Sequence, residues 1–141
     1  MNTNDTNNIN EELLDKISSI TEKIKKIKTK YLLDTKLTIP QYSVLEVVRR
    51  KGTIPLKGIG DELNVTGANI TCIIDNLEKE NLIRRIPSRQ DRRIILAELT
   101  KDGEEKINQI LPVYKSQIEE LLKIYTVEEK ETLLKLLEKI V

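Results

Sequence analysis

Apolar residues recur at steps of three and four along most of this chain, and this spacing constrains the fold more than any other feature. From Leu13 to Tyr31 the steps are 4, 3, 4, 3 and 4, and similar rows occupy residues 107–122 and 133–140. Because an α-helix has about 3.6 residues per turn, each row forms an apolar stripe along one helix face. The sequence therefore predicts a mainly α-helical protein with long helical segments at both ends.

Helix-capping signals predict shorter helices in the middle of the chain. Thr38 and Gln41 have the spacing of a capping box, and they are expected to start a helix that ends at Gly52. A short helix is expected to follow Pro55, and another to begin at Thr66.

The helix that begins at Thr66 has two unlike faces. Its apolar residues lie on one side: Ile70, Ile73, Ile74 and Leu77. At about 100° per residue, the opposite side and its flanks carry Ala68, Asn69, Thr71, Cys72, Asp75, Asn76 and Lys79. An exposed face of mostly small and polar residues allows a helix to approach another surface closely.

Residues 84–93 form the most basic part of the chain. They include five arginines and one aspartate, a local net charge of +4, although the whole chain carries only +1. Short β-rich runs at residues 83–86 and 94–99 predict a hairpin with a basic tip. Arginine fits phosphate oxygens, so this hairpin and the preceding helix are typical of a two-part nucleic-acid-binding surface. The alternative is that the arginines neutralise acidic residues, namely Asp75, Glu78, Glu98 or those of the C-terminal third.

The composition excludes several kinds of chemistry. With no histidine and one cysteine, the chain lacks the usual ligands of a zinc cluster, an imidazole base and an intramolecular disulfide. We therefore expect no enzyme activity and no cofactor. The N-terminal segment is polar and no apolar run approaches the ~18 residues of a membrane span, which predicts a cytoplasmic protein that does not enter a membrane.

Three segments in register carry a family resemblance. They are LTIPQYSVLEVV from Leu37, IGDELNVTGANITCIIDNLEKENLIRR from Ile59 and DRRIILAELTKDGEEKI from Asp91. Together they resemble the MarR family, the multiple antibiotic resistance regulators, over nearly the whole chain from the first long helix onward. Each segment alone is a common winged-helix fragment, but the combination is specific.

The resemblance implies a mainly α fold with a small β-hairpin wing. The chain then divides into a disordered tail (residues 1–9), an N-terminal dimerisation helix (10–36), a winged helix-turn-helix DNA-binding lobe (37–99) and C-terminal dimerisation helices (100–141). The resemblance also implies a homodimer that binds double-stranded DNA at a pseudo-palindromic operator, represses transcription and is released by a small aromatic or phenolic effector or by oxidation. The apolar stripes of the terminal helices favour a dimer independently, because one small lobe cannot cover them.

Carried over by position, the resemblance also implies the residues that contact DNA. In the recognition helix these are Thr66, Gly67, Ala68, Asn69, Thr71, Cys72 and Asn76, and in the wing they are Arg89, Arg92 and Arg93. Asn69 is the candidate for reading a base edge, since an amide side chain pairs well with adenine. We expect Asp75 and Asp91 to orient the wing arginines through ion pairs, because unpaired carboxylates would repel phosphate.

Cys72 departs from the family pattern, since many relatives have arginine at this position. One interpretation is an incidental small residue, and the other is a thiol whose oxidation blocks DNA binding. The first is favoured because the oxidation-sensing branch of the family carries its reactive cysteine in the first helix, where this chain has none. A second class of function also stays open, a helical protein-interaction module that uses the winged fold without binding DNA.

Overall fold

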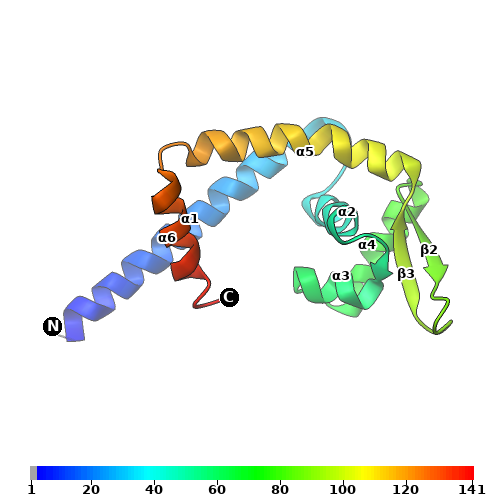
Figure 1. Ribbon diagram of the computed structural model, residues 1–141, viewed down its shortest axis with the longest axis horizontal. Helices are drawn as coiled ribbons and strands as arrows, with labels where there is room; N and C mark the ends of the chain where they lie inside the picture. The colour runs from blue at the N-terminus through cyan, green and yellow to red at the C-terminus, as the bar shows by residue number, and fades with distance from the viewer. Residues whose placement is uncertain (1–2) are drawn as a thin grey trace.

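The computed structural model describes residues 3–141, which form a mainly α-helical molecule with one small antiparallel sheet (Figure 1). The elements are α1 (Thr3–Leu32), the 3-10 turn η1 (Leu33–Thr35), α2 (Ile39–Lys51), β1 (Ile54–Pro55), α3 (Leu56–Leu63), α4 (Gly67–Lys79), β2 (Ile83–Pro87), β3 (Ile95–Leu99), α5 (Lys101–Leu122) and α6 (Val127–Leu137). The predicted fold class and order of elements are confirmed.

The helix starts in the middle of the chain follow from the residues that cap them. The Thr38 N–H donates to Gln41 Oε1 at 2.9 Å, and the Gln41 N–H donates to Thr38 Oγ1 at 3.3 Å, so the predicted capping box is present. Thr126 and Glu129 make the same reciprocal pair at the start of α6. At the end of α3, Asn64 takes the left-handed conformation with φ 53°, which stops the helix.

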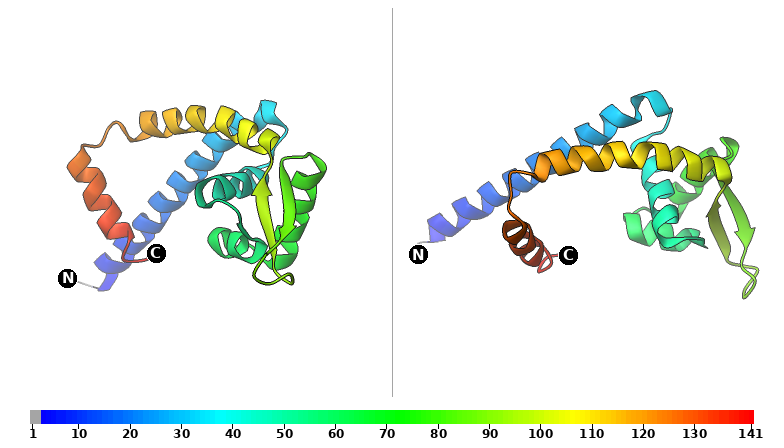
Figure 2. Two further views of the ribbon diagram at one scale, coloured as in Figure 1. Left: turned by 45° about the vertical axis from the view of Figure 1, so that its right-hand side comes forward. Right: turned by 45° about the horizontal axis from the view of Figure 1, so that its top comes forward.

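The hydrophobic core lies in the lobe formed by α2, α3, α4 and the sheet, and α5 completes it. The fully buried side chains come from all of these helices and include Leu45, Ile59, Ile74 and Ile107. In the sheet β3 lies between β1 and β2, and the β2–β3 hairpin projects beyond the helices of the lobe (Figures 1 and 2).

The start of α5 is locked against the turn between α4 and β2. Thr100 caps the helix by accepting a hydrogen bond from the Gly103 N–H at 3.0 Å, and its own N–H donates to the Leu82 carbonyl at 3.1 Å. A Cβ built on Gly103 would lie 2.9 Å from the Leu82 carbonyl carbon and still closer to its oxygen. The position that a full capping box would give to Glu or Gln therefore has no room for any side chain.

The N-terminal part of α1, the C-terminal part of α5 and all of α6 extend away from the lobe (Figure 1). Helix α5 packs against α1, and the chain then turns so that α6 lies on the far side from the β2–β3 hairpin (Figures 1 and 2). No residue of α6 is buried. None of the helices that the structure describes is apolar over a stretch long enough to cross a membrane.

Helix α1 begins at Thr3, so the prediction that residues 1–9 form a disordered tail differs from the structure. Residues 1 and 2 lie outside the described residues. The physical reason is cooperativity, because adding a residue to an existing helix forms one further backbone hydrogen bond and does not require an apolar contact.

Candidate nucleic-acid interface

The helix-turn-helix unit is formed by α3 and α4, joined by a tight turn at residues 64–66. A Cβ on Gly60 of α3 would lie 2.9 Å from the Val65 carbonyl oxygen and 3.2 Å from Ile70 Cγ1. Glycine at this position therefore allows the two helices to pack closely. Thr66 then caps α4 by accepting a hydrogen bond from the Asn69 N–H at 3.4 Å.

Helix α4 buries its apolar side and exposes the small, polar side. Ile70, Ile74 and Leu77 are at most 1% exposed. The residues predicted to contact DNA are all exposed: Thr66, Gly67, Ala68, Asn69, Thr71, Cys72 and Asn76. A Cβ on Gly67 would meet nothing within 4 Å, so the start of this helix is open to a close approach.

Asp91 organises the tip of the wing. Its Oδ1 accepts hydrogen bonds from the Arg93 backbone N–H at 3.0 Å and from Arg93 Nε at 3.1 Å, while Oδ2 lies 3.1 Å from Arg93 Nη2. These donors hold the pKa of the Asp91 carboxyl below its ordinary value. The Arg93 side chain is 91% exposed, so Asp91 orients its guanidinium and leaves it open to solvent. The structure thus gives Asp91 the geometry of an orienting residue.

The other arginines of residues 84–93 fall into two groups. Arg84 forms an ion pair with its cross-strand partner Glu98, with 2.5 Å between Nε and Oε2. Arg85 pairs with Asp75 and Glu78 of α4. Within residues 3–141, Arg89 and Arg92 make no ion pair and are exposed.

The ion pairs that the alternative describes are present at the base of the hairpin, whereas DNA contact by the tip stays a prediction. At the base of the hairpin, arginines neutralise Asp75, Glu78 and Glu98, as the alternative states. At the tip, Arg89, Arg92 and Arg93 remain available to a partner. Asp75 does form an ion pair with the wing, but its partner is Arg85 in strand β2 and not one of the tip arginines.

Three residues that position the elements of this lobe are not among the predicted site residues: Gly60, Gly103 and Arg85. No local pattern marks the two glycines, because the atoms that exclude a Cβ come from other segments of the chain. A signal for Arg85 did exist. Side chains alternate along a strand, so Arg85 shares its face with Ile83, which is buried.

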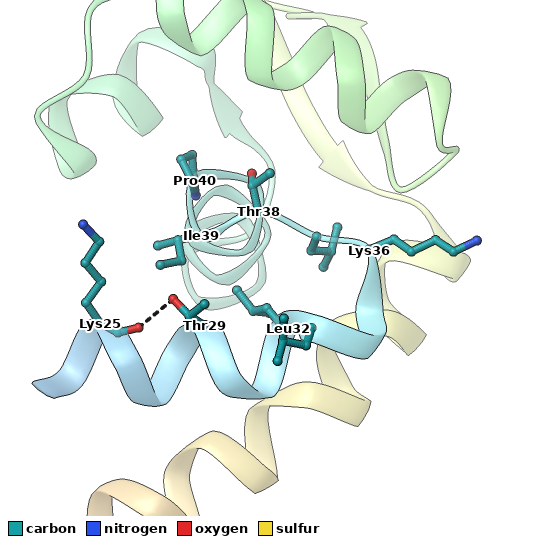
Figure 3. Close-up of a pocket in the computed structure, with 9 residues that line it drawn as sticks. Lys25, Thr29, Leu32, Lys36, Thr38, Ile39 and Pro40 are labelled. Atoms are coloured by element: carbon teal, nitrogen blue, oxygen red, sulfur yellow. Dashed lines mark hydrogen bonds between the residues drawn. The ribbon is translucent and has the colours of Figure 1, made fainter. Parts of the chain in front are cut away.

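An open cavity of about 570 Å³ lies between the end of α1 and the start of α2 (Figure 3). It is lined by Lys25, Thr29, Leu32, Leu33, Lys36, Leu37, Thr38, Ile39 and Pro40. Most of this lining is aliphatic, and Lys25 stands at one end with its ammonium group free of any ion pair among the described residues.

Tyr42 and Tyr114 pack against each other where α2 meets α5, with ring centroids 6.0 Å apart and planes at 68°. The Tyr42 side chain is 3% exposed, and its hydroxyl has no hydrogen-bond partner within the described part of the chain. Burial raises the pKa of Tyr42 to about 12 and also raises the pKa of Tyr114. No group of three or more potential metal ligands occurs in residues 3–141.

The arrangement of a helix-turn-helix, an exposed polar recognition helix and a basic β-wing defines a winged-helix DNA-binding protein. Comparison with known proteins agrees. The family model described as MarR family matches residues 37–95. The transcriptional regulator MhqR of Bacillus subtilis is 33% identical over 100 residues, which cover 71% of this chain and 69% of MhqR. The transcriptional repressor MdtR of the same organism is 31% identical, covering 66% of this chain and 60% of MdtR.

A solved structure shows the same similarity at the level of the fold. The crystal structure of a mutant MarR from Escherichia coli complexed with operator DNA superposes with a TM-score of 0.82 at 27% identity, covering 92% of this chain and 94% of that one. This chain belongs to the MarR family and is a DNA-binding transcription regulator.

Proposed function

We propose that this regulator acts as a homodimer that represses transcription by occupying a pseudo-palindromic operator. The observation that carries the dimer is the uncovered apolar surface of the terminal helices. The exposed apolar residues include Ile9, Leu13, Leu14, Ile17 and Ile20 in α1, and Val127, Leu133, Leu134, Leu136, Leu137 and Ile140 in and just after α6. An isolated helix of 11 residues, the length of α6, is marginal in water, so this surface needs a covering partner.

A second copy of the chain is the partner that fits. In a two-fold dimer each protomer presents the same surface, so α1 and α6 of one copy cover those of the other with no further component. Residues 10–36 and 100–141 then serve dimerisation, and residues 37–99 bind DNA. The two α4 helices read major grooves about one helical turn, 34–36 Å, apart, which requires an operator with matching half-sites.

Light scattering at fixed protein concentration tests the dimer. We expect the wild-type chain to have twice the mass of the 16.3 kDa protomer. The double variant Leu133→Asp, Leu137→Asp should dissociate, because it places two charges in the proposed contact. Lys135→Asp, a charge change at an exposed polar position of the same helix, is the matched control and should remain dimeric. A monomeric wild-type chain would contradict the proposal.

DNA binding is tested with duplexes that the wild-type protein selects from a random-sequence library. Affinity for a selected duplex should fall steeply between about 50 and 200 mM salt, because binding releases counterions from the phosphates. An affinity that salt does not change would instead favour the protein-interaction module. A reporter gene placed behind the selected sequence should be expressed less when the protein is present. Increased expression would contradict the repressor role, which the similarity to MdtR supports.

The cavity beside α1 and α2 supports a small aromatic acid or phenol as the effector. Its volume of about 570 Å³ lies within the range of small-molecule sites, and its aliphatic lining suits a ring, with the Lys25 ammonium for a carboxylate. Benzoate is a suitable probe and should lower affinity for the selected duplex. Lys25→Met should abolish this effect, and Lys23→Met, two residues away on the other side of α1 and outside the cavity lining, should preserve it. An unchanged affinity with benzoate at saturating concentration would contradict an aromatic acid as the effector.

A further inference from the structure

Arg85 is the arginine of the wing that turns inward. In the hairpin register Arg85 is opposite Ala97, which is fully buried, whereas its neighbour Arg84 is on the other face opposite Glu98. The Arg85 side chain is accordingly 25% exposed, against 63% for Arg84. The Arg85 guanidinium therefore faces α4 and not the surroundings of the wing.

Four contacts join Arg85 to the recognition helix. Its Nη2 lies 2.5 Å from Asp75 Oδ1 and donates to the Thr71 carbonyl oxygen at 3.3 Å. Its Nη1 lies 3.1 Å from Glu78 Oε1, and its backbone N–H donates to the other oxygen of the same carboxylate, also at 3.1 Å. One residue of β2 thus binds two successive turns of α4.

The three partners lie on one stripe of α4. Thr71, Asp75 and Glu78 follow each other at steps of four and three, the spacing of neighbours on a helix face. The contacts of Arg85 with Thr71, Asp75 and Glu78 together form a clamp on α4. Thr71 is itself one of the residues proposed to contact DNA, so this clamp holds α4 at the turn that would read the bases. Asp75 and Glu78 are about half exposed, and without a cation beside them they would repel phosphate.

We propose that Arg85 is a positioning residue that sets the orientation of the recognition helix relative to the wing, and so determines discrimination between operator and other DNA. This inference rests on the proposed contacts of α4. A hydrogen bond to a base edge depends steeply on angle and distance, whereas attraction to phosphate tolerates a shift of the helix. Loosening the clamp therefore reduces specific binding much more than non-specific binding. Both terminal nitrogens of Arg85 are engaged by α4, so Arg85 does not serve as a phosphate contact.

Arg85→Lys tests the clamp because lysine keeps the charge but lacks the fork that reaches both carboxylates. Affinities are measured by fluorescence anisotropy for a duplex selected by the wild-type protein and for a scrambled duplex of the same length. We expect the ratio of the two affinities to fall roughly tenfold or more, the effect of about one mismatched base pair, with the salt dependence unchanged. Arg84→Lys, on the opposite face of the same strand, is the matched control and should keep the wild-type ratio.

Other roles for Arg85 predict different effects of these substitutions on the two affinities. If Arg85 contacts phosphate, Arg85→Met lowers both affinities alike and reduces the salt slope by about one, which overturns the proposal. If the residue only stabilises the fold, Arg85→Lys lowers the melting temperature but keeps the wild-type ratio below it, which also overturns the proposal. Should Arg85→Lys fail to fold, Asp75→Asn removes one partner and is expected to lower the ratio, and an unchanged ratio refutes the clamp. A wild-type protein that does not discriminate at all refutes the proposed function instead.

Discussion

Replacing Gly103 by alanine should destabilise the protein, although alanine is the better helix former. Glycine in a helix interior costs up to about 1 kcal/mol relative to alanine, so propensity alone predicts that Gly103→Ala stabilises the fold. The structure predicts the opposite sign. The new Cβ would lie 2.9 Å from the Leu82 carbonyl carbon, closer to its oxygen, and 3.2 Å from Leu99 Cδ2.

The Leu82 carbonyl cannot move aside cheaply. The Leu82 N–H donates to the Leu77 carbonyl at 2.9 Å, and its own carbonyl accepts from the Thr100 N–H at 3.1 Å. Overpacking of this kind costs about 1–3 kcal/mol, and here the obstructing atoms are backbone, so we expect the upper part of that range. After the gain in helix propensity, the free energy of unfolding should fall by about 2 kcal/mol.

Urea denaturation followed by far-UV circular dichroism measures this change. Protein concentration must be held constant, because dimerisation couples stability to concentration. The matched control is Gly58→Ala in α3, where the new Cβ meets only Ile54 Cδ1, at 3.9 Å. That variant should gain up to about 1 kcal/mol. A Gly103→Ala protein at least as stable as the wild type would refute the reasoning, because the close contact of the new Cβ would then cost no more than the gain in helix propensity.

The remaining predictions concern four side chains. Tyr42→Phe should raise the free energy of unfolding at neutral pH by about 1 kcal/mol, since it removes a buried hydroxyl that has no hydrogen-bond partner among the described residues. The wild type should also lose stability between pH 10 and 12, because tyrosine in the unfolded chain ionises at a pKa of about 10 while folded Tyr42 has a pKa of about 12. A Tyr42→Phe variant that loses as much stability over this pH range would contradict the assignment of this loss to Tyr42. Arg93→Ala should weaken binding to all duplexes and reduce the salt slope by about one, and an unchanged slope would exclude a phosphate contact. Asn69→Ala should relax preference at one base pair in a selection experiment, and an unaltered selected sequence would remove Asn69 as a base reader. Peroxide should leave DNA binding unchanged, and a loss of binding that Cys72→Ser prevents would show that the thiol is redox-active.

The sequence predicted the parts of the fold that depend on near neighbours. The capping box of Thr38 and Gln41 and the exposed side of α4 each depend on residues at most a few positions apart. The start of α1 was predicted wrongly although it is local, because a helix extends through polar residues without an apolar stripe to mark them.

The arginines of residues 84–93 show most clearly which properties a local sequence pattern does not predict. Sequence alone determined that residues 84–93 carry a local charge of +4 and that a hairpin presents them. It named Asp75 and Glu78 as possible partners but could not say which arginine binds them, because the β2–β3 register fixes the orientation of Arg85. The exclusion of a side chain at Gly103 likewise comes from a backbone carbonyl in another segment.

The sequence by itself determined the helical composition, the order of elements, the polar face of α4 and the basic hairpin. These properties follow from periodicity, caps and charge, which act between residues close in the chain. The tertiary structure decided which arginines are neutralised at the base of the wing and which remain available at its tip. That division depends on where α4 packs against β2, and such packing brings together groups that no local pattern relates.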